Sequence, residues 1–138
     1  LLHIPDELDE SAMKTLSQVP EIKTTLEYIK RTDILVFSIG RADVMAKRRK
    51  LPEDKVDEIL SKNAVGEAFG YYFNKDGEIV YKLNTVGIDL ETVKQVKETI
   101  AIFAGTEKVE ALLAISNMHK NMVLVTDEES AYKILSLL

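Results

Sequence analysis

The segment Ile34-Leu35-Val36-Phe37-Ser38-Ile39-Gly40 decides the fold class of this chain. It is an almost unbroken run of aliphatic and aromatic residues that ends at a glycine. Because polar residues do not alternate with the apolar ones, both faces of such a strand are apolar, which is typical of a central parallel strand covered by helices on both sides. We therefore predict a parallel sheet with residues 34–39 in its interior.

Helix-like and strand-like segments alternate on both sides of this run. We expect helices over 11–18, 21–31 (with Pro20 in the first turn), 43–50, 52–62, 90–97 (capped by Asp89), 107–117, and from the cap Asp127 to 135. Further strands are expected over 1–4, 99–104 and 122–126. This alternation with short junctions predicts an α/β fold, a mostly parallel, Rossmann-like sheet flanked by helices.

A β-hairpin interrupts the alternation. Two strand-like stretches, 64–73 and 78–83, flank the turn Asn74-Lys75-Asp76-Gly77, so we expect an inserted β-hairpin. If 64–73 is one strand, Glu67 shares a face with Val65, Phe69, Tyr71 and Phe73. A carboxylate among apolar neighbours needs partners. Sugar hydroxyls, a buried Arg or Lys, or solvent at a fraying strand end remain alternatives for Glu67.

Composition restricts the function classes. The chain has 138 residues, 46% of them hydrophobic, and a net charge of −5, which fits one folded domain without nucleic-acid binding by this piece alone. It has no cysteine and two histidines, so we expect no disulfide, no thiolate nucleophile, no metal site and no cofactor. No apolar run reaches the ~20 residues of a membrane helix. We expect a cytoplasmic protein without a membrane partner.

Strand-to-helix junctions are the candidate ligand sites, because ligands of open parallel sheets bind outside the carboxyl ends of the strands. One junction begins at Gly40. A second, Gly105-Thr106-Glu107-Lys108, combines a glycine, a helix start and a lysine, which is a minimal phosphate-binding arrangement or else a plain turn. The cluster Lys47-Arg48-Arg49-Lys50 follows the first junction. Consecutive residues point all around a helix, so at most one or two of these cations can face a phosphate, and a solvated helix face is the alternative for the whole cluster.

Five segments appear in an order that resembles a known family: Ser38-Ile39-Gly40 with Met45-Ala46-Lys47-Arg48-Arg49-Lys50, Gly66-Glu67-Ala68-Phe69-Gly70-Tyr71-Tyr72-Phe73, Ala104-Gly105-Thr106-Glu107-Lys108, and Val123-Leu124-Val125-Thr126-Asp127-Glu128. Together they resemble the sugar-binding domain of SorC-type bacterial transcriptional regulators. The resemblance spans the whole chain and is most specific from Gly66 to Phe73.

The resemblance implies an effector-binding domain over residues 1–138, related in fold to sugar-phosphate isomerases. It implies a repressor of sugar or glycolytic genes that acts as a homo-oligomer and reads operator DNA through a separate N-terminal domain absent from this chain. The implied effector is a phosphorylated sugar such as fructose 1,6-bisphosphate. Arg48 and Lys108 would hold phosphate and Glu67 would accept hydrogen bonds from sugar hydroxyls. The junction residues Gly40, Gly105 and Thr106 complete the predicted site.

Two features depart from the family pattern. Ala104 stands where the family usually has a glycine, and the glycine- and threonine-rich strand and loop that opens the family domain is not matched, so we expect a domain truncated at its N-terminus. An isomerase or deaminase with Glu67 as general base is the alternative, although no partner His or carboxylate is evident from spacing. A purely structural dimerisation module is a third. We expect no catalytic residue.

Overall fold

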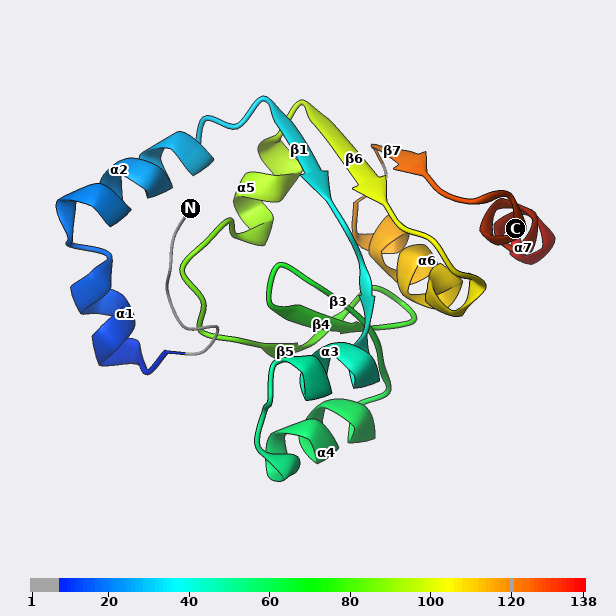
Figure 1. Ribbon diagram of the computed structural model, residues 1–138, viewed down its shortest axis with the longest axis horizontal. Helices are drawn as coiled ribbons and strands as arrows, with labels where there is room; N and C mark the ends of the chain where they lie inside the picture. The colour runs from blue at the N-terminus through cyan, green and yellow to red at the C-terminus, as the bar shows by residue number, and fades with distance from the viewer. Residues whose placement is uncertain (1–7, 120) are drawn as a thin grey trace.

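Two sheets with different hydrogen-bonding patterns organise the chain (Figure 1). The computed structural model describes residues 8–119 and 121–138. A parallel sheet has the order β1 (Ile34–Phe37), β6 (Glu98–Ile102), β7 (Met122–Val125). An antiparallel sheet has the order β2 (Gly40–Arg41), β3 (Ala64–Ala68), β4 (Tyr71–Asn74), β5 (Ile79–Lys82). The predicted α/β fold with a parallel sheet and an antiparallel excursion is therefore confirmed.

The helices form where capping residues and apolar spacing predict them. They are α1 (Glu10–Leu16), α2 (Pro20–Ile29), α3 (Ala42–Arg48), α4 (Glu53–Ser61), α5 (Leu90–Gln95), the 3₁₀ turn η1 (Thr106–Lys108), α6 (Val109–Met118) and α7 (Glu128–Leu137). Asp89 and Asp127 cap α5 and α7 by accepting backbone N–H groups, and Pro20 opens α2, as predicted. The strand predicted over 1–4 lies outside the described residues.

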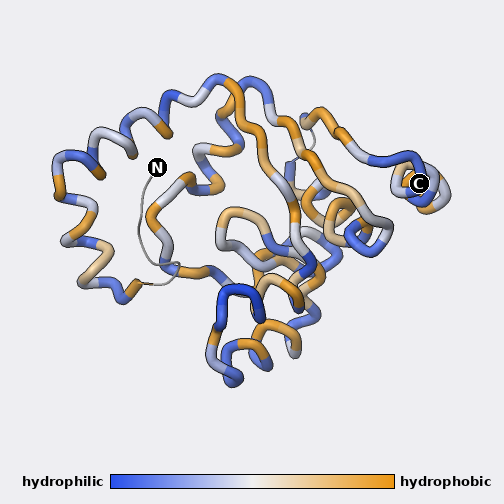
Figure 2. Tube along the Cα trace, in the orientation of Figure 1, coloured by the Kyte–Doolittle hydropathy of each residue, from blue (hydrophilic) through white to orange (hydrophobic). Residues whose placement is uncertain are grey.

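One apolar core joins the two sheets through α6. Its residues Ala111 and Ile115 pack with Ala101 and Phe103 from the parallel side and with Phe73 from the antiparallel side. A second cluster, which includes Ala46, Ile59 and Tyr72, fixes α3 and α4 to the outer face of the antiparallel sheet. Figure 2 shows apolar residues along β1 and β6, and a strongly hydrophilic stretch where α3 ends. None of the helices in the described ranges is long and apolar enough to cross a membrane.

The prediction that residues 34–39 form a central, fully covered strand is wrong. Within the described residues β1 is an edge strand that pairs only with β6. Ile34 and Val36 are 56% and 57% exposed, because none of the described elements covers that face of the strand. The strand also ends at Phe37, and Ser38 and Ile39 carry the chain across to β2 in the other sheet.

The prediction of a single strand over 64–73 is also wrong. The segment folds back on itself at Phe69 and Gly70, whose φ angles of +57° and +82° form a two-residue hairpin turn. Glu67 therefore pairs across the ladder with Tyr72 rather than sharing a face with Tyr71 and Phe73. The phenyl ring of Phe69 packs 4.8 Å from that of Phe37, centroid to centroid, which offsets the cost of a left-handed non-glycine residue.

Gly70→Ala is expected to lower the free energy of unfolding by about 1–2 kcal/mol, because an L-residue is strained at a positive φ. The added Cβ would also lie 3.2 Å from the Thr85 hydroxyl oxygen. Gly87→Ala is the matched control, since its Cβ would meet no atom within 4 Å. Urea denaturation measures both variants. Equal stability of the two would contradict the assigned turn.

Candidate functional site

A cavity of about 410 Å³ opens where the chain passes from the parallel sheet into the antiparallel one. It lies at the carboxyl end of β1 and beside the turn that follows β6, which is the edge where parallel sheets bind ligands. The cavity is lined by the junction between β1 and β2, by β2, by α3 and its C-cap, by β3 and the turn after it, and by η1. The lining residues are Ser38, Ile39, Gly40, Arg41, Val44, Met45, Arg48, Arg49, Glu67, Ala68, Phe69, Glu107 and Lys108.

The structure brings four of the six predicted site residues to this cavity: Gly40, Arg48, Glu67 and Lys108. They come from β2, α3, β3 and η1, and Gly40 is the cross-strand partner of Glu67. Their lining of one cavity does not test whether they bind an effector, so the assignment remains a prediction.

The other two predicted residues, Gly105 and Thr106, do not line the cavity. The Gly105 N–H donates to the Asp127 carboxylate at 2.9 Å, and the Thr106 carbonyl accepts from the Lys133 ammonium at 2.9 Å. The Gly105 N–H is therefore already occupied and does not offer the open phosphate-binding amide that the sequence pattern indicated.

Glu67 is a buried carboxylate, only 3% exposed, whose partners are well defined. Its Oε1 accepts a hydrogen bond from the Arg49 guanidinium at 3.0 Å and one from the Gly70 N–H at 2.7 Å. The second bond exists because the turn at Phe69 and Gly70 folds its backbone toward the carboxylate. Of the alternatives that the sequence left open, the structure shows pairing with an arginine, which is partly rather than fully buried.

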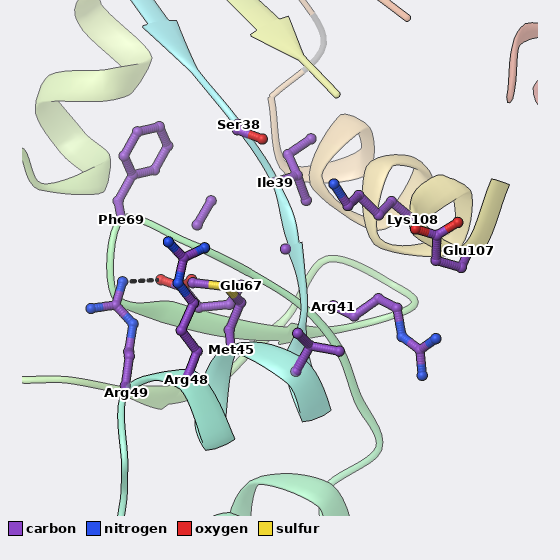
Figure 3. A pocket seen from close by; sticks show the side chains of 13 residues that line it. Ser38, Ile39, Arg41, Met45, Arg48, Arg49, Glu67, Phe69, Glu107 and Lys108 are labelled. Atoms are coloured by element: carbon purple, nitrogen blue, oxygen red, sulfur yellow. Dashed lines mark hydrogen bonds and ion pairs between the residues drawn. The ribbon is translucent and has the colours of Figure 1, made fainter. Parts of the chain in front are cut away.

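Arg49 is a cavity residue that the sequence did not single out. Helix α3 ends at Arg48 with Arg49 as its C-cap, and Lys50 then takes a φ of +55°, so the chain turns away just after Arg49. Figure 3 shows Arg48 and Arg49 side by side next to Glu67, with the dashed ion pair running from Arg49. The run of four cations was the only available signal, and helical geometry alone does not tell which of them faces inward.

Lys108 approaches the cavity from the opposite side. It belongs to the 3₁₀ turn before α6, and its side chain points toward the part of the cavity lined by Ser38 and Ile39 (Figure 3). The adjacent Glu107 lines the same end. Arg41 extends away from Glu67 in Figure 3 and forms a two-bond ion pair with Asp43, with contacts of 2.7 and 3.1 Å.

The charges of the cavity differ in how they are neutralised. Burial works against ionisation of Asp43, but hydrogen bonds from Arg41 and from backbone N–H groups hold the pKa of Asp43 below its usual value. Arg41 and Arg49 are thus each paired with a carboxylate. Among the ion pairs between described residues, none involves Arg48 or Lys108. Those two cations are the ones available to an anion.

The described residues contain no group of three or more His, Asp or Glu side chains placed to hold a metal ion. What the cavity offers is a combination of two available cations, one oriented carboxylate and an apolar floor that includes Ile39, Met45 and Phe69. This combination suits a ligand that carries both anionic groups and hydroxyls.

Comparison with known proteins identifies the family of this chain. The family model named Sugar-bind, which describes a sugar-binding domain, matches residues 1–136. The chain is 42% identical over 135 residues to the central glycolytic genes regulator of Bacillus subtilis, an alignment that covers 98% of this chain and 40% of the relative. It is 27% identical over 107 residues to the erythritol catabolism regulatory protein EryD of Brucella abortus, covering 73% of this chain and 34% of the relative.

Solved structures show the same fold. A SorC family transcriptional regulator from Enterococcus faecalis superposes with a TM-score of 0.88 at 37% identity, over 97% of this chain and 55% of that one. The full-length sorbitol operon regulator SorC of Klebsiella pneumoniae superposes with a TM-score of 0.84 at 21% identity, over 98% of this chain and 46% of that one, which is a likeness of fold alone.

The chain spans about 40% of the length of the two glycolytic regulators that it matches. The match of the family model to nearly the entire chain nevertheless establishes the family. This chain belongs to the sugar-binding domain family of SorC-type transcriptional regulators.

Proposed function

We propose that this chain is part of the effector-binding domain of a bacterial repressor of glycolytic genes, and that its effector is a phosphorylated sugar such as fructose 1,6-bisphosphate. The observation that carries the proposal is the placement of Arg48 and Lys108, two cations without a described ion-pair partner, around one cavity with the buried carboxylate of Glu67. The names of two relatives, both central glycolytic genes regulators, support the choice of regulated genes.

Each group has a distinct role in this proposal. Arg48 and Lys108 lie on different sides of the cavity and bind phosphate oxygens, the guanidinium by paired hydrogen bonds and the ammonium as a point charge. Glu67 uses Oε1 for Arg49 and Gly70, so its Oε2 is the oxygen that accepts sugar hydroxyls. Cations on two sides favour a ligand with two phosphates over a ligand with one.

The signal passes to DNA through a change in assembly. We propose a separate N-terminal DNA-binding domain in a longer, homo-oligomeric protein, consistent with relatives that extend well beyond this chain and are named as regulators. An effector that binds one arrangement of subunits more tightly shifts the population toward that arrangement, and operator affinity changes by the same coupling free energy.

The geometry favours binding over the alternative of sugar-phosphate isomerisation or deamination. Glu67 is the base that such an enzyme would need, yet its Oε1 is already engaged by an arginine and a backbone N–H, which fix its position. The proposal therefore gives Glu67 a recognition role and assigns no catalytic residue.

Lys108→Met and Arg48→Met, made in the complete regulator, are each expected to weaken fructose 1,6-bisphosphate binding by about ten- to a hundredfold, because each removes a charged hydrogen bond to phosphate. Lys47→Met is the matched control, since Lys47 is an exposed cation on the same helix that does not line the cavity. Isothermal titration calorimetry measures the affinities. If all three variants bind like the parent protein, the site assignment fails.

Glu67→Gln is expected to lower the free energy of unfolding by about 1–3 kcal/mol, because it removes the charge that pairs with the partly buried Arg49 guanidinium. In the double variant with Arg49→Met, part of this loss is recovered, since no uncompensated charge remains. Urea denaturation of the two single variants and the double variant measures the coupling. Strictly additive losses would show that the ion pair does not orient Glu67.

A further inference from the structure

Two long-range hydrogen bonds connect the C-terminal helix α7 to the turn that carries Lys108. The carboxylate Oδ2 of Asp127 accepts the Gly105 N–H at 2.9 Å, across 22 residues of sequence. One and a half turns further along α7, the Lys133 ammonium donates to the Thr106 carbonyl at 2.9 Å. Neither Asp127 nor Lys133 lines the cavity. Their contacts act on the backbone just before Lys108.

Gly105 has a restricted backbone conformation at the start of this turn. Its φ of +102° is a conformation that side chains rarely allow, and a Cβ there would overlap the Glu107 carboxylate. Its carbonyl accepts the Lys108 N–H at 3.1 Å, which closes the 3₁₀ turn. The Gly105 residue is thus held by Asp127 on its N–H side and bonded to Lys108 on its carbonyl side.

The Asp127 carboxylate that holds Gly105 is itself fixed by further hydrogen bonds, which also favour its charged form. Its Oδ1 accepts the Ser130 N–H at 2.9 Å, and its Oδ2 also accepts the Ser130 hydroxyl at 2.8 Å. Hydrogen bonds from the backbone N–H groups of Ser130 and Gly105 and from the Ser130 hydroxyl lower the pKa of Asp127 to about 2. Because the folded-state value is depressed, the stabilising contribution of Asp127 is complete above its unfolded pKa and declines only as the pH falls toward 2.

We propose that Asp127 is a positioning residue for the sugar-phosphate site: by fixing the Gly105 peptide, its carboxylate directs Lys108 into the cavity. This inference rests on the proposed function, because it assumes that Lys108 binds a phosphate. It adds a residue of α7, outside the cavity, to the set that determines effector affinity.

Asp127→Asn separates this role from helix capping. Asparagine caps helices about as well as aspartate, so the bond to the Ser130 N–H is retained. The substitution replaces one carboxylate oxygen by an NH₂ group, which cannot accept the Gly105 N–H. Two controls match it. Ser130→Ala removes a hydroxyl from the same cap and leaves the Gly105 bond intact, and Glu128→Gln removes an exposed neighbouring charge.

The first measurement needs no effector and uses the 138-residue chain. Amide hydrogen exchange, followed by NMR, is expected to show the Gly105 N–H at least about tenfold less protected in Asp127→Asn than in the parent chain. Protection in Ser130→Ala and Glu128→Gln stays within about twofold of the parent. If Gly105 exchanges equally slowly in Asp127→Asn, the bond does not hold this residue and the inference is overturned.

The second measurement is a double-mutant cycle on fructose 1,6-bisphosphate affinity in the complete regulator. Asp127→Asn alone is expected to weaken binding by about three- to tenfold, and to have almost no effect once Lys108 is already Met, because it acts through that side chain. An Asp127→Asn effect of the same size in both backgrounds would indicate a general structural role and overturn the inference. If Lys108→Met itself leaves affinity unchanged, the proposed function fails at its site, and the positioning role fails with it.

Discussion

Glu67 places a carboxylate that is only 3% exposed against two hydrogen-bond donors, and the neighbouring segments are shaped around that pairing. A buried carboxylate is costly unless it is paired and hydrogen-bonded. The Arg49 guanidinium and the Gly70 N–H meet both needs at a single oxygen. Each partner in turn imposes a local structure: α3 must end before Arg49, and the backbone must turn sharply at Phe69 and Gly70.

This pairing also explains how an acidic chain presents a cationic cavity. The net charge of the sequence is −5, but local placement rather than net charge determines the potential in a cleft. Arg49 neutralises Glu67 and Asp43 neutralises Arg41, which leaves Arg48 and Lys108 against the single carboxylate of Glu107, so the remaining charge of the lining is positive. One oxygen of Glu67 then remains as an acceptor at a fixed position. The proposed function thus assigns anion binding and hydroxyl recognition to one cavity.

The parts of this arrangement that could be predicted are those determined by neighbouring residues. Apolar runs located the parallel strands, and Asp89 and Asp127 were recognised as caps because capping depends on residues three positions away. Gly40, Arg48, Glu67 and Lys108 were selected by residue type beside strand ends or in an unusual strand, and they line the same cavity.

The parts that could not be predicted depend on distant contacts or on rare backbone conformations. A left-handed phenylalanine is uncommon, and Gly70 by itself does not distinguish a turn from a glycine within a strand, so the turn at Phe69 is not evident from the run Ala64 to Phe73. Arg49 could not be distinguished from Arg48, because the end of α3 depends on the turn at Lys50. The contact between Asp127 and Gly105 joins two junctions that are far apart in the sequence, so local pattern does not reveal it.

The central claim is that this cavity binds a phosphorylated sugar, and an NMR titration tests it most directly. Fructose 1,6-bisphosphate is added to ¹⁵N-labelled protein, with fructose and inorganic phosphate as separate comparisons. The account predicts saturable amide shifts concentrated at Gly40, Glu67 and Lys108, and much weaker shifts with either comparison ligand. It would be contradicted by a spectrum of the labelled protein that does not change, or by shifts that gather at the separate cavity of about 260 Å³ beside Lys30 and Asp89.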